Sequence, residues 1–313
     1  MSDFVNFNEL VDSIVIEKDY GANRPVVEKE LLHYDILYAL SATGLLKHIT
    51  FQGGTSLRLC YGSNRFSEDL DFAGGRDFCS AQLLEIKACI EKYVGERYGL
   101  EVVVKEPKEL RKEPDYADVK VDKWQISVTT NPGKKDLPKQ KIKVEIANIP
   151  AYTNTLRTLV KNYEQLPSGY SDLIIRVEEL TEVMADKLVS FPVTTSRIRY
   201  RDMWDLVWLH QKGVKPDAEL VMKKVADYKL NEHFEEWLQA RIESLPALVA
   251  SEKFKGEMKR FLPVSVVDRT LLHPDFLEFL QITLHELLVT IQTDIYGSKD
   301  PKPVKKFEME HSS

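Results

Sequence analysis

The stretch that decides the fold reads Arg-Phe-Ser-Glu-Asp-Leu-Asp-Phe at residues 65–72, a short way after Phe-Gln-Gly-Gly-Thr-Ser at residues 51–56. Successive side chains of a β-strand point to opposite faces. If residues 65–72 form a strand, Leu70 and Phe72 face a hydrophobic core. The other face then carries the polar side chains, which are Ser67, Asp69 and Asp71. The alternation therefore predicts two carboxylates side by side on one face of a strand.

These two carboxylates are candidate metal ligands. On a strand the Cα atoms of Asp69 and Asp71 lie roughly 6 to 7 Å apart. Their side chains can then converge on one or two Mg²⁺ or Mn²⁺ ions about 3.5 to 4 Å apart, which is the arrangement used in metal-assisted phosphoryl chemistry. An ordinary solvated strand face also carries alternating Asp residues, so the alternation alone leaves both interpretations open.

The Gly-rich turn at residues 53–56 favours the metal interpretation. Backbone N–H groups at a helix N-terminus bind phosphate, so we expect Gly53, Gly54, Thr55 and Ser56 to contact a nucleotide. Gly-Gly is also a common loop signal, and the two hydroxyl residues are good helix caps. The informative feature is the order, in which a Gly-rich turn, a short helix and an acidic strand follow one another.

Composition sets the class of protein. The 313 residues are 43% hydrophobic and 29% charged, which is ordinary for a globular chain and most simply predicts two domains. No run of 18 apolar residues and no signal-peptide pattern is present, so we expect a cytoplasmic protein with no membrane partner. The three cysteines have no metal-ligand spacing, and no Walker or Gly-x-Ser-x-Gly run occurs.

Periodicity predicts alternating helices and strands in the first half of the chain. Helices are expected at residues 26–47, 55–61 and 80–98, with Ser80 as the last one's N-cap, and strands at 48–51, 102–105, 119–129 and 140–147. The last two strands are expected to be antiparallel. Ile142, Val144 and Ile146 alternate inward, so Glu145 shares the outward face and is a candidate third carboxylate.

The second half of the chain is predicted to be helical from about residue 178 to 295. A Pro-Ser-Gly loop at residues 167–169 marks the change. We therefore expect a first domain over residues 1–175, a helical domain over 176–297 that completes the active site, and a poorly ordered tail over 298–313.

Lys187 lies on the apolar stripe of its helix, four residues after Val183. Such a lysine either extends its ammonium group to water or aims it at nucleotide phosphates. Asp202 and Asp205 are three residues apart on the next predicted helix, where they could stabilise the helix N-terminus or pair with Lys187. The sequence leaves open which of the two matters.

Basic residues flank the predicted site. They are a surface feature in most proteins, but next to a phosphate site they could bind an RNA end. Ser67 is either a surface serine or, next to Mg²⁺, a phosphate acceptor. The basic residues are Arg197, Arg199, Arg201, Lys134, Lys135, Lys139, Lys141 and Lys143.

The sequence resembles the AbiEii/AbiGii-type nucleotidyltransferase toxins over about residues 26–210. The matching segments are Val-Glu-Lys-Glu-Leu-Leu at 27–32, Phe-Gln-Gly-Gly-Thr-Ser-Leu-Arg at 51–58, residues 65–72, the Lys187 helix, and Arg-Asp-Met-Trp-Asp-Leu at 201–206. A departure occurs at Glu30, where many members carry Asp. The resemblance implies an α+β fold with a polymerase-beta-like nucleotidyltransferase mixed sheet and flanking helices, followed by a helical C-terminal domain.

The resemblance also implies an activity and its partners. Relatives of the MenT kind transfer nucleotides from an NTP to tRNA 3′ ends, and these toxins have cognate antitoxin proteins in toxin–antitoxin or phage-defence systems. We therefore expect Asp69, Asp71, Lys187, Asp202, Asp205 and Glu145 to form the catalytic site. Open alternatives are nucleotide transfer to a protein or small molecule, self-phosphorylation at Ser67, and nucleotide binding without catalysis.

Overall fold

The computed structural model describes residues 4–107, 120–134, 136–194 and 197–297. Lys135 and the predicted tail at 298–313 lie outside the described residues. The strands are β1 (Thr50–Gln52), β2 (Leu70–Ala73), β3 (Val102–Lys105), β4 (Val121–Val128), β5 (Gln140–Ala147), β6 (Thr155–Thr158) and β7 (Ile174–Val177). They form one mixed sheet in the order β3-β4-β5-β2-β1-β7-β6. The α+β fold with a mixed sheet is therefore confirmed.

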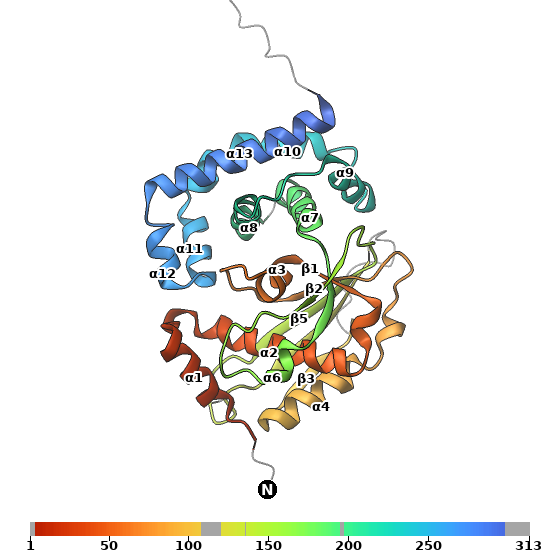
Figure 1. Cartoon of the computed structure of the whole chain (residues 1–313), viewed down its shortest axis with the longest axis vertical. Coiled ribbons are helices and arrows are strands. Elements are labelled where there is room, and N and C mark those ends of the chain that lie inside the picture. The colour runs from red at the N-terminus through yellow and green to blue at the C-terminus, as the bar shows by residue number, and fades with distance from the viewer. Residues whose placement is uncertain (1–3, 108–119, 135, 195–196, 298–313) are drawn as a thin grey trace, which may run out of the picture.

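Helices cover the sheet and then form a second layer above it (Figure 1). The first half of the chain contains α1 (Phe7–Lys18), α2 (Arg24–Ala42), α3 (Gly53–Tyr61), α4 (Ile86–Tyr98) and α6 (Ser168–Ser171). The second half contains α7 (Leu180–Val193), α8 (Tyr200–Gln211), α9 (Ala218–Asp227), α10 (Phe234–Ala250), α11 (Glu252–Phe261), α12 (Val264–Arg269) and α13 (Pro274–Tyr296). Short 3-10 turns are η1 (Gly21–Asn23), η2 (Leu45–His48) and η3 (Ser80–Leu83).

The acidic strand is shorter than predicted. It begins at Leu70, so Ser67 and Asp69 precede the strand, although Leu70 and Phe72 are fully buried as expected. The predicted helix over 80–98 also divides in two, because η3 ends before α4 begins at Ile86, and Ser80 is not its N-cap. By contrast, the helix predicted over 55–61 ends at Tyr61 as expected, and Gly62 caps it in the left-handed conformation at φ +74°.

Two hydrophobic cores hold the molecule together. One packs the inward side chains of the sheet against α1, α2 and α4, and the other fills the space among α7 to α13. Leu57 of α3 belongs to the helical core, while Phe261 of α11 belongs to the sheet core. Each half therefore contributes a side chain to the core of the other. The division into residues 1–175 and 176–297 stays a prediction. No helix among the described residues is long and apolar enough to cross a membrane.

Candidate active site

Three predicted carboxylates meet where β1, β2 and β5 lie side by side. Asp71 is the direct partner of Glu145 on the parallel strand β5 and of Gln52 on the antiparallel strand β1. Residues in register on adjacent strands project from the same face. Asp69 precedes β2, and its Oδ1 accepts a hydrogen bond of 3.0 Å from the backbone N–H of Lys143. All three acids line one cavity of about 360 Å³.

The three carboxylates repel one another. Burial, and next to it the charges of Glu145 and Asp69, raise the pKa of Asp71 to about 7. Arg199 and Lys187 oppose this shift only in part. Glu145 Oε1 lies 3.7 Å from Lys123 Nζ and 3.8 Å from Lys143 Nζ. Negative charge is thus concentrated around Asp71 and is offset only in part by the nearby cations, which is a situation that a bound divalent cation relieves.

The donor set fits a divalent metal ion by its chemistry. Carboxylate oxygens are the ligands that Mg²⁺ and Mn²⁺ prefer. Within the described ranges, no three His, Cys, Asp or Glu side chains already converge as a metal site. Asp69, Asp71 and Glu145 are nevertheless the residues that would hold the ion, because they are adjacent and only partly neutralised.

The Gly-rich turn brings the backbone against the acids. Gly53 has φ +77°, and a Cβ atom there would lie 2.8 Å from Asp71 Oδ2. A Cβ atom on Gly54 would overlap Arg65 Nη2 and lie 3.2 Å from Ser67 Oγ. Glycine is therefore required twice, once for its left-handed conformation and once for close approach. The turn opens α3, whose first N–H groups have no partner within the helix, and Gly54 lines the cavity together with the acids.

Gly53→Ala tests this requirement. We expect a loss of about 1 to 3 kcal/mol in the free energy of unfolding, because alanine is strained at this φ and its Cβ displaces the Asp71 carboxylate. Urea unfolding measures the change. Gly21→Ala is the matched control, since a Cβ atom there meets nothing within 4 Å. Equal stabilities of the two variants would contradict the close approach.

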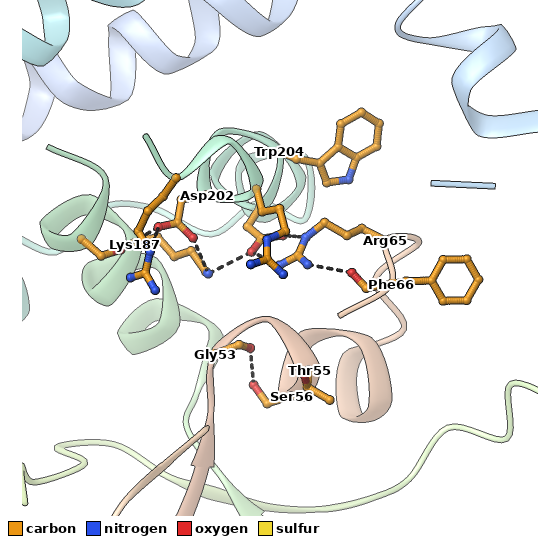
Figure 2. A network of polar contacts seen from close by, with 12 residues as sticks. Gly53, Thr55, Ser56, Arg65, Phe66, Lys187, Asp202 and Trp204 are labelled. Atoms are coloured by element: carbon orange, nitrogen blue, oxygen red, sulfur yellow. Dashed lines mark hydrogen bonds and ion pairs between the residues drawn. The ribbon is translucent and has the colours of Figure 1, made fainter. Parts of the chain in front are cut away.

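Thr55 and Ser56 are buried in the first turn of α3. Thr55 Oγ1 donates to the carbonyl of Asp69, and Ser56 Oγ donates to the carbonyl of Gly53 at 2.8 Å. Figure 2 shows the Ser56 bond inside the turn. These hydroxyls fix the turn and the Asp69 backbone. Their predicted contact with a nucleotide stays a prediction.

Lys187 lies in a buried ion-pair network (Figure 2). Its Nζ lies 2.7 Å from Asp202 Oδ1 and 2.9 Å from Asp205 Oδ2. Asp205 also accepts a bidentate pair from Arg65, with Nε at 2.7 Å from Oδ1. Although burial opposes its ionisation, Arg65 and Lys187 hold the pKa of Asp205 well below its usual range. Both aspartates pair with Lys187, so the choice left open by the sequence does not arise.

Asp202 extends the network toward the cavity. Its Oδ2 accepts a hydrogen bond of 2.8 Å from Ser190 Oγ and lies 3.6 Å from Arg199 Nε. Lys187 and Arg199 therefore stand at the cavity wall with their positions set by a carboxylate. Sequence reasoning gave Arg65 no role of its own. The sequence feature that could have revealed a role for Arg65 is its position at the start of the 65–72 motif. A charged residue next to buried positions needs a partner of opposite charge.

Two cavities share Asp71 and Glu145, while Asp69 lines only the smaller one. The larger, of about 590 Å³, and the smaller both contain Gly54, Asp71, Glu145, Lys187, Thr194 and Arg199. The larger cavity adds apolar walls, which include Phe72, Val183, Val193, Tyr228 and Leu230. The smaller adds cations and a hydroxyl, which are Arg65, Lys143, Arg197, Arg201 and Ser67. An apolar chamber and a basic chamber thus meet at the carboxylates.

The predicted basic residues divide between these places. Lys143, Arg197, Arg199 and Arg201 line the smaller cavity. Arg201 is tied to Glu68 at 3.4 Å and to Glu257 at 3.5 Å. On the β4–β5 hairpin, Lys139 pairs with Glu101 at 2.8 Å, and Lys134 and Lys141 are not among the cavity residues. Lys135 is not among the described residues.

Comparisons with known proteins give a consistent result. The family model described as nucleotidyl transferase AbiEii toxin, type IV TA system, matches residues 35–282. The solved structure of MenT4, a nucleotidyltransferase toxin from Mycobacterium tuberculosis H37Rv, is similar at TM-score 0.54 and 20% identity, and the match covers 90% of this chain and 89% of that chain. JHP933 from Helicobacter pylori gives TM-score 0.47 and 19% identity over 86% and 93%. No curated protein matches the sequence.

Proposed function

Since this chain belongs to the AbiEii family of nucleotidyltransferase toxins, which the match over residues 35–282 shows, we propose that it transfers a nucleoside monophosphate from an NTP to a tRNA 3′ end. The family is that of a type IV toxin–antitoxin system, so the chain is a nucleotidyltransferase toxin. The observation that carries the proposed chemistry is the register of Asp71 with Glu145 beside the Gly53 turn and close to Lys187. Cytoplasmic action, phage defence and a separate antitoxin protein belong to the same proposal.

The NTP would span both cavities. Its triphosphate is highly anionic and suits the smaller cavity, where the α3 N–H groups, Lys187 and Arg199 stand. Its nucleoside suits the larger cavity, whose walls include Tyr228 and Leu230. The α-phosphate then lies where the cavities meet, beside Asp71.

The chain's own residues supply position and charge. A Mg²⁺ or Mn²⁺ ion held by Asp69, Asp71 and Glu145 would neutralise phosphate charge and lower the pKa of the acceptor hydroxyl. Lys187, fixed by Asp202 and Asp205, places positive charge against the phosphates. The acceptor hydroxyl loses its proton to water and its oxygen bonds to the α-phosphorus. The bond from that phosphorus to the bridging oxygen breaks, and pyrophosphate leaves.

Label transfer tests this function. NTP labelled at the α-phosphate, incubated with total tRNA and Mg²⁺, should label the RNA. The Asp69→Ala, Asp71→Ala double variant should not. Labelling that survives the double change contradicts the assignment of the acids. Binding of NTP with no pyrophosphate release favours a binding module.

Ser67 is a second candidate acceptor, because it lines the smaller cavity together with Asp69. Its hydroxyl lies close to the turn, since it is 3.2 Å from where a Gly54 Cβ atom would be. Label on the protein indicates nucleotide transfer to a side chain, because a γ-phosphate transferred to Ser67 carries no α-label. Mass spectrometry of Ser67 detects that phosphorylation as an added phosphate without a nucleoside. A labelled small molecule in the reaction mixture indicates the remaining alternative acceptor.

Exposed cations at the smaller cavity support an RNA acceptor. Arg197 and Lys143 are exposed there, so they can contact backbone phosphates. We expect Arg197→Ala to raise the KM for tRNA several-fold and to leave the Kd for NTP within about twofold. The rise should shrink as salt increases, because phosphate contacts are screened. Lys134→Ala on the hairpin is the matched control; an equal effect there indicates general charge attraction.

A further inference from the structure

A second buried charge cluster lies beside the larger cavity, away from the three candidate metal ligands. Lys224 of α9 is fully buried, and its Nζ lies 2.6 Å from Glu182 Oε1, 3.1 Å from Asp186 Oδ1 and 3.3 Å from Glu178 Oε1. One ammonium group thus faces three carboxyl groups. The side chains of Glu178 and Glu182 are 0% exposed, whereas that of Asp186 is 24% exposed. Asp186 also lines the larger cavity, which the other members of the cluster do not.

The three carboxyl groups of this cluster differ in their hydrogen-bond partners and in the pKa shifts that burial causes. Glu182 accepts the backbone N–H groups of Tyr152, at 2.9 Å, and of Thr153, so it is well stabilised as a carboxylate next to Lys224. Burial, and then the charge of Asp186, raise the pKa of Glu178 well above its ordinary value. Burial also raises the pKa of Asp186, and the charge of Lys224 opposes that rise. Asp186 is the member of the cluster that reaches the cavity wall, with Lys224 beside its Oδ1 atom.

The surroundings of Asp186 suit a nucleoside. The larger cavity is lined by Tyr228 and several apolar side chains, and Asp71 and Glu145 line it too. Gln52 is also among its lining residues, and the Oε1 atom of Gln52 is buried with no hydrogen-bond partner among the described residues. The carboxyl group of Asp186 and the unsatisfied carboxamide oxygen of Gln52 are acceptors that suit a ligand with hydrogen-bond donors.

We propose that Asp186 recognises the nucleoside of the NTP by accepting hydrogen bonds from its ribose hydroxyl or base N–H groups. This role rests on the proposed function, in which the nucleoside occupies the larger cavity. The ion pair with Lys224 positions Asp186 Oδ1, and the side chain of Asp186 is 24% exposed where it lines the cavity. Asp186 is thus a specificity-determining residue, one position before Lys187 on α7.

The test uses binding, which does not depend on transfer. The probes are α,β-methylene NTPs, whose α,β bridge cannot be cleaved, with ribose or 2′-deoxyribose and each of the four bases. Their Kd values are measured by titration calorimetry in Mg²⁺ with the full chain and with Asp186→Asn. A hydrogen bond to a charged group corresponds to a change of about 10- to 100-fold in Kd. Asp268→Asn, an exposed Asp on α12, is the matched control.

Two outcomes support the proposal and distinguish the source of the donor. If the ratio of deoxy to ribo Kd falls toward one in Asp186→Asn, the ribose is the donor. If instead the preference among bases disappears, the donor is the base. Unchanged ratios of both kinds overturn the proposal. Asp186→Glu keeps the charge beside Lys224, so it covers the case in which the Asn variant does not fold, and it too should change one ratio.

The failure of the proposed function gives different results. If no analogue binds the full chain, the NTP site itself is refuted. If analogues bind and the Asp186 ratios change but tRNA is not labelled, only the acceptor assignment fails.

Discussion

Asp71→Asn should lower the rate of nucleotidyl transfer by about 10³-fold or more. The variant loses a negative metal ligand, and the charge stabilisation of several kcal/mol that the metal supplies corresponds to this factor. In metal-free buffer at about pH 8 the same variant should be more stable than the unmodified chain, by about 1 to 3 kcal/mol. It removes a charge that burial, Glu145 and Asp69 all oppose. Urea unfolding and label transfer measure the two effects.

The stability gain has a defined pH dependence. The pKa of Asp71 is raised from 3.8 to about 7, so the folded chain keeps this proton over a range in which the unfolded chain has lost it. The group therefore destabilises the fold fully above about pH 7, and this effect fades as the pH falls toward 4. The stability gained by Asp71→Asn should therefore be greatest above about pH 7 and should decrease as the pH falls toward 4. Mg²⁺ should raise the stability of the unmodified chain but hardly that of the variant.

Asp77→Asn is the control, because Asp77 is exposed a few residues beyond β2. It should change neither transfer nor the free energy of unfolding by a measurable amount. A variant Asp71→Asn that transfers nucleotide within tenfold of the normal rate, or that is less stable at pH 8, would show that Asp71 is not part of a crowded metal-binding group.

Asp205→Asn should lower the free energy of unfolding by about 3 to 5 kcal/mol. Asp205 is fully buried and binds both Arg65 and Lys187, so its loss leaves two buried cations with Asp202 as the remaining carboxylate. The pKa of Asp205 is lowered despite burial, so its contribution is present above about pH 4 and disappears only as the pH falls further. The destabilisation should therefore be equal at pH 6 and pH 8, unlike the effect at Asp71.

A double-mutant cycle separates the ion pair from packing. Arg65→Met combined with Asp205→Asn should be less destabilised than the sum of the single changes, with a coupling of about 1 to 3 kcal/mol, because no uncompensated guanidinium remains. Additive single effects would mean that Arg65 and Asp205 do not act as a pair. Asp294→Asn, on the exposed side of α13, should be neutral.

The sequence predicted the local part of the fold and the candidate site. Alternation placed Leu70 and Phe72 in the core, and the helix predicted over 55–61 ends at the same residue as α3. These features depend on the chain's own geometry, since a strand alternates and a left-handed position favours glycine wherever they occur. The alternation rule was wrong at the start of β2, which was predicted to include Ser67 and Asp69. A strand needs a hydrogen-bonded neighbour, and the pairing of β2 with β1 and β5 begins only after these two residues.

Only the tertiary structure decided which distant residues meet. Asp71 pairs with Glu145 through strand order, Arg65 reaches Asp205 across 140 residues, and Lys224 meets Asp186 through the packing of α9 on α7. Nothing in the local sequence distinguishes Lys224 from a surface lysine of a helix, yet its side chain is fully buried. The sequence by itself thus determined the family, the sheet-forming pattern and the acidic motif, because these are encoded in neighbouring residues. The ion-pair network, the two cavities and the burial of Lys224 beside Asp186 arise from long-range packing and desolvation, which no local spacing specifies.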